Sequence, residues 1–302
     1  MNKTKGKSAD RWTIIKLLSW TESYFKDHAI DSPRLTGEIL LAKILGIRRL
    51  DLYLQHDRPL EKKELTQFKS LIKRRILHEP VAYITGEKGF YEADFKVGQG
   101  VLIPRPDTEI LVETAMDRLK PFDSKSCRIL ELGTGSGAIV VSLALACPEH
   151  KYFACDISSL ALATARTNVQ KICATPVGLF QGSWLDAVAP GAGFHLILSN
   201  PPYIPRADIE KLAPEIRDHE PRLALDGGPD GLDSIRQILA QASDCLVPGG
   251  QVILEMGYDQ KKAVANIAAD CAWVNDVQFI KDLAGHNRLV VLKKSIDYPL
   301  GI

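Results

Sequence analysis

The sequence predicts an α/β fold preceded by a small helical domain, and three features of the chain support this. Beyond about residue 106, short apolar segments bounded by turn residues alternate with helical stretches, as in proteins built around a parallel sheet. A glycine-rich turn follows the first of these segments. Before about residue 80 the pattern is helical, without strand-like alternation or glycine motifs. The 302 residues are enough for two domains, each with its own core.

Residues 1–80 are predicted to form a helical bundle. Their apolar residues recur at helical spacing in two sets: Leu41, Ile44 and Leu45, and then Leu65, Phe68, Ile72 and Ile76. Pro80 is expected to end the last of these helices. The basic clusters Arg48-Arg49 and Lys73-Arg74-Arg75 are more often solvated faces than partner-binding surfaces.

Residues 81–105 are rich in aromatic residues and glycines, so we expect a hairpin linker there. Pro106 fits the first turn of a helix that opens the α/β domain, residues 106–302. The strands of that domain are expected at residues 129–132, 152–155, 177–181, 194–198 and 251–256 and near Val277 and Leu289, and its further helices at 138–146, 232–246 and 261–270. The long connection after residue 203 is expected to form a lid or a substrate wall.

The segment Asn200-Pro201-Pro202-Tyr203 directly follows an apolar run that reads as a buried strand. Ligands of open α/β sheets lie beyond the carboxyl ends of the strands. Proline has no N–H, so the loop cannot satisfy its own carbonyls locally. We expect the side-chain oxygen of Asn200 and the carbonyl of Pro201 to accept the two N–H bonds of a planar NH2 group, with Tyr203 packed against it. The alternative is an ordinary turn.

The glycine-rich turn reads as a nucleotide-binding first βα turn. Its glycines allow unusual backbone angles and close approach to a ligand, and Asp156 ends the next strand, where a carboxylate can bind a ribose. Gly133, Gly135 and Ala138 also satisfy a dinucleotide-binding pattern. Glu131 favours S-adenosylmethionine instead, because a carboxylate attracts a cationic sulfonium and ammonium and repels a pyrophosphate. The expected cofactor-binding residues are Gly133, Thr134, Gly135, Ser136, Gly137, Asp156, Trp184 and Asn200.

Trp184 is predicted either to flank the adenine ring of the cofactor or to fill the core. The formal net charge of +1 argues against a large, uniformly basic surface for nucleic acid. The six cysteines lack C-x-x-C spacing and the seven histidines form no H-E-x-x-H motif, so neither disulfides nor a metal site are expected. The lysine-rich N-terminus carries no apolar signal core and no apolar run is long enough for a membrane span, which predicts a cytoplasmic protein.

Five motifs together resemble the PrmC/HemK family of release-factor glutamine methyltransferases. They are, in order, Glu79 to Gly86, Leu102 to Glu109, Glu131 to Gly137, Asn200 to Tyr203, and Glu220-Pro221 through Leu225 to Gly228. The resemblance implies a class I S-adenosylmethionine-dependent methyltransferase fold, with a seven-stranded Rossmann-like sheet whose last strand is reversed. It also implies an N-terminal helical domain that helps to dock the substrate.

The substrate implied by the resemblance is the glutamine in the Gly-Gly-Gln motif of peptide chain release factors 1 and 2, methylated at N5. The resemblance assigns the glutamine to Asn200, Pro201, Pro202 and Tyr203, and the protein is expected to be a monomer. The chain departs from the family at Ser183, where an aspartate often precedes the tryptophan. Asp186 is an alternative contact for the adenine amine, and the spacing does not decide between them.

Three other functions remain open at this point. The same loop can hold the amine of adenine or guanine, so the main alternative is an N-methyltransferase acting on DNA or RNA, which needs an unpaired base. A non-catalytic cofactor-binding scaffold and a nicotinamide oxidoreductase are the others. Comparing label transfer to a release factor, DNA and RNA would identify a nucleic-acid methyltransferase. Cofactor-binding calorimetry would identify a nicotinamide oxidoreductase.

Overall fold

The computed structural model describes residues 11–122 and 126–298. The lysine-rich segment of residues 1–10 lies outside these ranges. The chain divides into two compact units, Met1–Gly86 and Glu87–Ile302. Of the predicted linker, residues 81–86 belong to the first unit and residues 87–105 to the second. No helix in the described ranges is long and apolar enough to cross a bilayer.

The first unit is a helical bundle, as predicted. Its helices are α1 (Ile14–Asp27), α2 (Pro33–Leu45), α3 (Arg49–Leu54), α4 (Lys62–Arg75) and α5 (Val81–Thr85). Leu41, Phe68 and Ile72 lie in its apolar core, and Ile44, Leu45, Leu65 and Ile76 pack against that core. The expectation for Pro80 was wrong: α4 already ends at Arg75, and Pro80 precedes α5 as its N-cap with φ −56°. Proline suits that place because its fixed φ favours the start of a helix.

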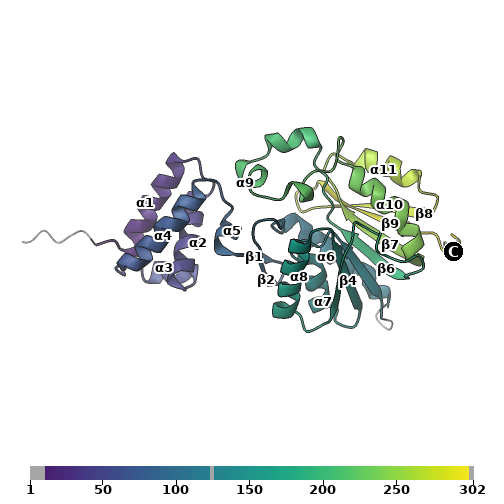
Figure 1. The fold of residues 1–302 in the computed structure, drawn as a ribbon, viewed down its shortest axis with the longest axis horizontal. Coiled ribbons are helices and arrows are strands. Elements are labelled where there is room, and N and C mark those ends of the chain that lie inside the picture. Colours follow the sequence, from purple (N-terminus) through teal and green to yellow (C-terminus); the bar gives the residue numbers. More distant parts are fainter. Residues whose placement is uncertain (1–10, 123–125, 299–302) are drawn as a thin grey trace, which may run out of the picture. The chain divides into compact units, whose positions relative to one another are not determined.

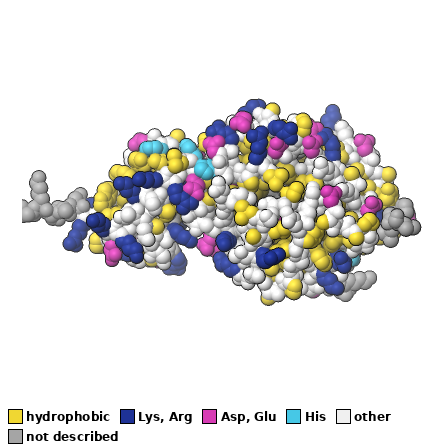
Figure 2. Space-filling view, viewed as in Figure 1, with side chains coloured by type: hydrophobic (Ala, Val, Ile, Leu, Met, Phe, Trp, Pro, Cys, Tyr) yellow, Lys and Arg dark blue, Asp and Glu magenta, His cyan; other side chains and the backbone are white. Residues whose placement is uncertain are grey.

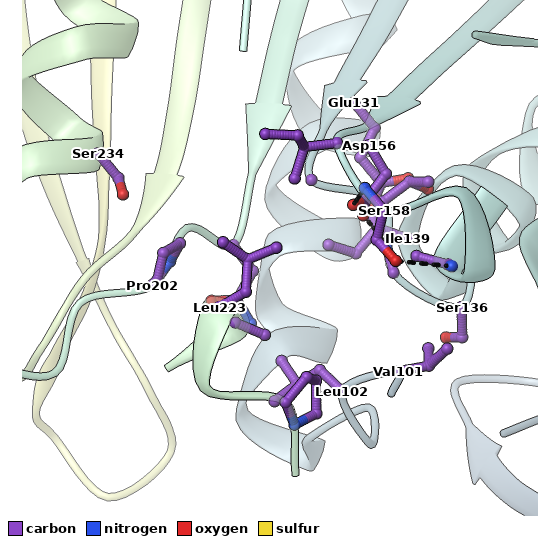
Figure 3. Close-up of a pocket in the computed structure, with 18 of the residues that line it drawn as sticks. Val101, Leu102, Glu131, Ser136, Ile139, Asp156, Ser158, Pro202, Leu223 and Ser234 are labelled. Atoms are coloured by element: carbon purple, nitrogen blue, oxygen red, sulfur yellow. Dashed lines mark hydrogen bonds between the residues drawn. The ribbon is translucent and has the colours of Figure 1, made fainter. Parts of the chain in front are cut away.

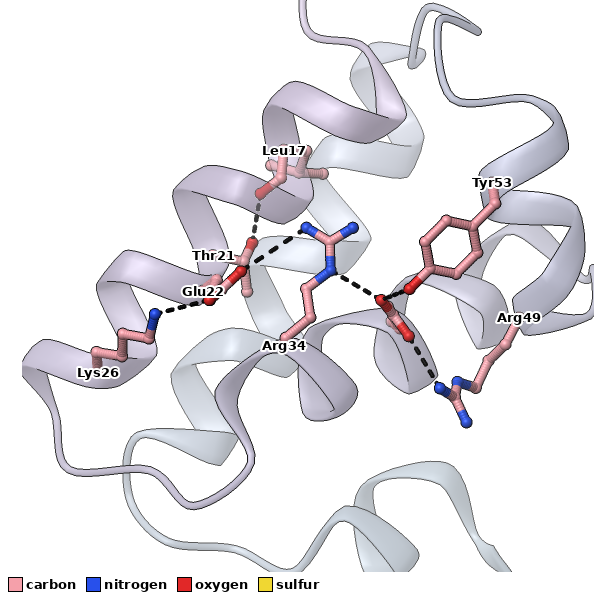
Figure 4. Close-up of polar contacts among 8 residues, drawn as sticks. Leu17, Thr21, Glu22, Lys26, Arg34, Arg49 and Tyr53 are labelled. Atoms are coloured by element: carbon pink, nitrogen blue, oxygen red, sulfur yellow. Dashed lines mark hydrogen bonds and ion pairs between the residues drawn. The ribbon is translucent and has the colours of Figure 1, made fainter.

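A buried carboxylate organises one side of this bundle. Glu38 on α2 accepts hydrogen bonds from Arg34 at 2.8 Å, from Arg49 at 2.9 Å and from the hydroxyl of Tyr53. Figure 4 shows Arg34, Arg49 and Tyr53 directed at this one carboxylate. Because Glu38 is only 1% exposed, its three partners balance the cost of removing its charge from water. Arg49 at the start of α3 and Tyr53 near its end are thereby fixed.

The second unit is a sheet with helices on both faces (Figure 1). Within the described ranges, seven strands form this sheet in the order β5-β4-β3-β6-β7-β9-β8. They are β3 (Arg128–Leu132), β4 (Lys151–Asp156), β5 (Val177–Gln181), β6 (Phe194–Ser199), β7 (Leu246–Glu255), β8 (Val274–Lys281) and β9 (Asn287–Lys294). β9 runs antiparallel to both of its neighbours, and the strands from β5 to β7 are parallel. The last strand is therefore reversed, as the resemblance implied.

Two apolar cores lie on opposite faces of this sheet. Helices α6 (Glu109–Leu119) and α7 (Ala138–Ala146) pack on one face, where Val169 and Ile172 of α8 (Ser159–Ile172) also contact the core. Helices α10 (Asp233–Cys245) and α11 (Lys261–Ala269) cover the other face. The predicted hairpin is present as β1 (Glu87–Phe90) and β2 (Ala93–Lys96), and its Phe90 and Phe95 join the first core.

Most strands and helices of the second unit lie where the sequence predicts them. The helix at 138–146 and the strand at 177–181 have the bounds of α7 and β5. Helix α8 was not predicted, nor were the short helices η3 (Arg206–Lys211), α9 (Pro214–Arg217) and η4 (Arg222–Ala224) in the long connection after residue 203. On the face of the second unit that is visible in Figure 2, basic side chains are interspersed with acidic ones.

Candidate active site

The site lies at the point where the order of the sheet reverses. From β3 the chain moves outward through β4 and β5 and then returns to β6 on the other side of β3. Such a switch point leaves a crevice at the carboxyl ends of the strands, where open α/β proteins bind ligands. A cavity of about 380 Å³ occupies this place. Figure 3 shows Glu131, Asp156 and Ser158 on one side of it and Pro202 and Ser234 on the other.

The glycine-rich turn leads from β3 into α7. Gly133, Gly135 and Gly137 have φ values of +67°, +56° and +81°, a region that side chains rarely adopt. A Cβ at Gly135 would meet nothing within 4 Å, and this residue lines the cavity with Gly133, Thr134 and Ser136. Gly137 does not line it: a Cβ there would lie 3.2 Å from Cβ of Ala165, so this glycine allows α7 to approach α8.

Glu131 is a buried carboxylate at the end of β3 that also lines the cavity. Its Oε2 accepts hydrogen bonds from the hydroxyl of Thr134 at 2.6 Å and from the backbone N–H of Val140 at 3.1 Å. Its Oε1 accepts none from the described residues. Burial raises the pKa of Glu131 to about 8, against the opposing effect of these two donors. An acidic group so placed favours a ligand that brings a positive charge.

Asp156 ends β4 beside the glycine-rich turn. Its Oδ2 accepts from the N–H of Gly135 and its Oδ1 from the N–H of Ser158, each at 2.9 Å. Burial raises its pKa, and these N–H groups oppose the change. A carboxylate has about four acceptor positions, so Asp156 can still accept hydroxyl groups from a ligand in the cavity.

Trp184 and Ser183 also line the cavity. Trp184 has φ +48°, an uncommon value for a bulky residue, and its ring lies 3.6 Å from the position of a Cβ on Gly133. Its side chain also packs against the second core, so the residue both borders the cavity and contributes to the core. Asp186 is exposed and accepts a hydrogen bond from Gln241 at 2.6 Å. Of the two alternatives for the adenine amine, Ser183 therefore borders the cavity and Asp186 does not.

The loop after β6 places Asn200 and Pro202 in the cavity wall. Pro201 is buried and is not among the residues that line the cavity, and its carbonyl accepts no hydrogen bond from the described residues. The carbonyls of Pro202 and Tyr203 are closely surrounded. A Cβ on Gly227 would lie 2.8 Å from the carbonyl oxygen of Pro202, and the carbonyl of Tyr203 accepts a hydrogen bond from the side chain of Gln260 at 2.9 Å. Gly227 in the following connection and the side chain of Gln260, neither of which lines the cavity, therefore pack against the loop.

The side-chain amide of Asn200 is oriented by a chain of buried groups. Its Nδ2 donates to the hydroxyl of Thr108 at 3.0 Å, and that hydroxyl donates to Oε2 of Glu255 at 2.7 Å. Oδ1 of Asn200 accepts no hydrogen bond from the described residues and is available to a ligand. Tyr203 is not among the residues that line the cavity. Its hydroxyl donates to Oε1 of Glu255 at 3.2 Å.

Other residues of the cavity wall come from two segments in which the sequence analysis predicted no individual site residue. The segment before α6 contributes Leu102, Arg105 and Thr108, and the connection after β6 contributes Leu223 and Asp226. Glu220 joins the two segments by accepting from the guanidinium of Arg105 and, at 3.2 Å, from the N–H of Ile103. Both segments belong to motifs of the family resemblance, which was the signal available in the sequence.

The six cysteines lie in the described ranges as free thiols. Across those ranges, no group of three or more His, Cys, Asp or Glu side chains is placed to hold a metal ion. The polar groups of the cavity wall include the carboxylates of Glu131 and Asp156, the carboxamides of Asn200 and Gln237, and several hydroxyl groups. They fit an organic ligand with hydroxyl groups and a positive charge.

Known proteins resemble this chain over most of its length. Residues 16–86 match the family model described as the PrmC N-terminal domain, and residues 106–219 match the Methyltransferase small domain. A release factor glutamine methyltransferase of Rhodopirellula baltica is 38% identical over 287 residues, covering 94% of this chain and 97% of that protein. Another, of Chlorobaculum tepidum, is 41% identical over 280 residues, with coverages of 90% and 94%.

A solved structure supports the fold independently. The crystal structure of a methyltransferase from Pyrococcus furiosus has a TM-score of 0.50 at 22% identity, covering 74% of this chain and 98% of that one. The class I methyltransferase fold and the family resemblance are both confirmed. With 38% to 41% identity over at least 90% of its length, the chain belongs to the release factor glutamine methyltransferase family.

Proposed function

We propose that the protein transfers a methyl group from S-adenosylmethionine to the side-chain amide nitrogen of the glutamine in the Gly-Gly-Gln motif of peptide chain release factors 1 and 2. The observation that carries this proposal is the orientation of Asn200. Its amide nitrogen is engaged by Thr108, and its oxygen is left for a ligand at the wall of the same cavity that the glycine-rich turn lines. Family membership supports the same reaction.

The glycine-rich side of the cavity would hold the methyl donor. Glu131 offers an unengaged carboxylate oxygen for its positive charge, Asp156 offers acceptors for its ribose hydroxyls, and Trp184 offers an aromatic ring for its adenine. Backbone at Gly133 and Gly135 lets the chain approach closely, because no side chain intervenes. When bound, S-adenosylmethionine supplies a methyl group on a positively charged sulfur.

The loop side would hold the glutamine. An amide nitrogen is a poor nucleophile because its lone pair is delocalised into the carbonyl. Oδ1 of Asn200 and the carbonyl of Pro201 accept no hydrogen bond within residues 11–122 and 126–298, and together they would fix the plane of the NH2 group. Catalysis then rests on positioning and on preoriented polar groups rather than on a strong base. The proton released from nitrogen passes to water or to a loop carbonyl.

The helical unit would help to dock the release factor. Three apolar side chains of α3 are unusually exposed, with Leu50 at 61%, Tyr53 at 52% and Leu54 at 71%. Arg48 and Arg49 stand beside them at the start of the helix, and Glu38 holds Arg49 and Tyr53 in place. Apolar side chains flanked by arginines suit a protein partner, because such residues are enriched at protein interfaces.

Label transfer tests this proposal directly. Purified protein, methyl-labelled donor and equal amounts of release factor, duplex DNA or unstructured RNA are incubated in parallel. The proposal predicts label in the release factor and none in either nucleic acid. A release factor whose Gly-Gly-Gln glutamine is changed to alanine serves as the matched control and should stay unlabelled. Label in adenine or guanine would favour the nucleic-acid alternative instead.

A further inference from the structure

Glu255 is a buried acidic residue that lies next to the active site without lining it. It ends β7, is 1% exposed and does not border the cavity. Both of its oxygens accept from residues that the proposed reaction involves: Oε2 from the hydroxyl of Thr108 at 2.7 Å and Oε1 from the hydroxyl of Tyr203 at 3.2 Å. Thr108 lies 147 residues away in the sequence from Glu255, so no local motif contains this contact.

The direction of these hydrogen bonds follows from what each group can donate. An ionised carboxylate only accepts, so the one hydrogen of the Thr108 hydroxyl is directed at Glu255. The oxygen of that hydroxyl is then left to accept, and only the NH2 end of the Asn200 amide can donate to it. The opposite end of the amide, its carbonyl oxygen, must point elsewhere. The orientation of a carboxamide is determined by its hydrogen-bond network in this way.

We propose that Glu255 and Thr108 are positioning residues: ionised Glu255, acting through the Thr108 hydroxyl, turns the carbonyl oxygen of Asn200 toward the substrate amide. This inference deepens the proposed function and rests on it. A flipped Asn200 would present its NH2 group to the NH2 of the substrate, and two donors cannot bond. Substrate orientation therefore depends on a carboxylate that never touches the substrate.

Protonation of Glu255 removes the constraint. A protonated carboxyl can donate to the Thr108 hydroxyl, which frees that hydroxyl to donate to a flipped Asn200. Three ionisable groups face Glu255: Arg288 on the neighbouring strand β9, Asp107 before α6, and Tyr203 in the loop after β6. Burial raises the pKa of Glu255 to about 7, while the Thr108 hydroxyl, Arg288 and Tyr203 favour the charged form. The orientation of Asn200 is thus sensitive to pH near neutrality.

The first test is a double-mutant cycle between Thr108 and Asn200. Thr108→Val removes the hydroxyl with little change of shape, and we expect kcat on the release factor to fall roughly tenfold, the loss of one hydrogen bond. Thr108→Ser should restore most of the rate. In an Asn200→Ala background, Thr108→Val should change kcat by less than about twofold, because the effect passes through Asn200. A merely structural role predicts losses that add, and additive losses would overturn the proposal.

The second test is the pH profile of kcat at saturating methyl donor. For the wild type we expect kcat to fall as the pH is lowered through about 7, the value to which burial raises the pKa of Glu255. Glu255→Gln cannot titrate, so its profile should lose this fall. If the variant keeps the acid-side fall of the wild type, Glu255 does not control the orientation. Melting curves confirm that the variants are folded. If Thr108→Val does not fold, the pH profile of Glu255→Gln decides the proposal by itself.

A third readout needs no methyl transfer and separates this inference from the proposed function. The side-chain amide signals of Asn200 in a ¹H–¹⁵N spectrum are assigned by their absence in Asn200→Ala. They should shift with pH near neutrality in the wild type and not in Glu255→Gln. An Asn200 signal that is independent of pH would refute the relay even if the release factor is methylated. A shifting signal in a protein that methylates no release factor would refute the proposed function instead.

Discussion

The two halves of the cavity are built in different ways. The glycine-rich half is made largely from one short segment, residues 131–136, with Asp156 joined to it by the N–H of Gly135. The loop half is made from the side chains of Thr108 and Asn200 on separate segments, with Glu255 behind them outside the cavity wall. The glycine-rich half would bind the methyl donor through the shape of its turn. The loop half would orient the side-chain amide of Asn200 through the hydrogen bonds of Thr108 and Glu255. We therefore expect damage to the first half to appear in cofactor affinity and damage to the second in turnover.

The largest expected effect is that of Asn200→Ala. Removing the oriented oxygen should lower kcat roughly 100-fold, as for loss of one preorganised polar contact, and this loss should exceed any loss of affinity for the methyl donor. Steady-state kinetics with release factor and calorimetry with the donor measure the two quantities. Asn266→Ala, on the exposed side of α11, is the matched control. An equal loss of cofactor affinity and turnover would remove the distinction between the two halves.

Asp156→Ala should show the opposite pattern. Its carboxylate holds the turn through Gly135 and would accept the ribose hydroxyls, and hydrogen bonds to charged groups contribute about 1.5–3 kcal/mol each. Affinity for the methyl donor should therefore weaken roughly tenfold or more, with kcat at saturating donor largely retained. Calorimetry measures the first, and Asp186→Ala, at an exposed position outside the cavity wall, is the control. Unaltered donor affinity would contradict the ribose assignment.

Glu131, in the glycine-rich half, should make the free energy of unfolding depend on pH. Burial raises its pKa from 4.5 to about 8, so between these values the folded protein binds more protons than the unfolded one. Its contribution to the free energy of unfolding is complete below pH 4.5 and is lost as the pH rises through about 8. Glu131→Gln should flatten this part of the stability curve, measured by denaturant unfolding at several pH values. A curve identical to that of the wild type would contradict the raised pKa.

Binding of the methyl donor should also release protons at pH 7, because its positive charge favours ionised Glu131. Calorimetry in buffers of different ionisation enthalpy measures this release. The Glu131→Gln variant is the control and should release fewer protons. Equal release from both proteins would show that another group responds to the ligand.

The smallest effect is expected outside the cavity, in the helical unit. Leu54→Asp places a charge on the exposed apolar side of α3 and should raise KM for the release factor a few-fold, since burying a leucine contributes about 1.5–3 kcal/mol at most. The kcat and the donor affinity should not change. Leu283→Asp, at a fully exposed leucine between β8 and β9, is the control. If both variants raise KM equally, the α3 surface has no special part in docking.

The same contrast explains how much of the molecule can be predicted from the sequence. Strands and the glycine-rich turn are readable because their signals are local: β5 and α7 have the predicted bounds, and Glu131 and Asp156 both lie in the cavity wall. Helix α8 was missed even though Ser158 caps it by accepting from the N–H of Ala161. The helix mixes leucines with short alanines and threonines, and β-branched threonines have low helix propensity, so the helical pattern is weak.

The relay behind Asn200 could not be predicted. Thr108 and Asn200 are 92 residues apart, and Glu255 lies on a third segment, so no spacing links them. Tyr203 illustrates the same limit: its ring is predicted to pack against the substrate, and no spacing in the sequence predicts that its hydroxyl donates to Glu255 outside the cavity wall. Burial and the nearby carboxylate raise the pKa of Tyr203, which keeps this hydroxyl a donor. Tertiary packing decides which way such side chains turn.

The proposed reaction can be checked by a mass spectrum of the peptide that contains the Gly-Gly-Gln motif, taken from release factor treated with this protein and methyl donor. We expect one added methyl group, located by fragmentation on the nitrogen of the glutamine side chain and strongly reduced with Asn200→Ala. A methyl group on another residue, or an unmodified peptide from a folded enzyme that binds the donor, would contradict the proposed reaction.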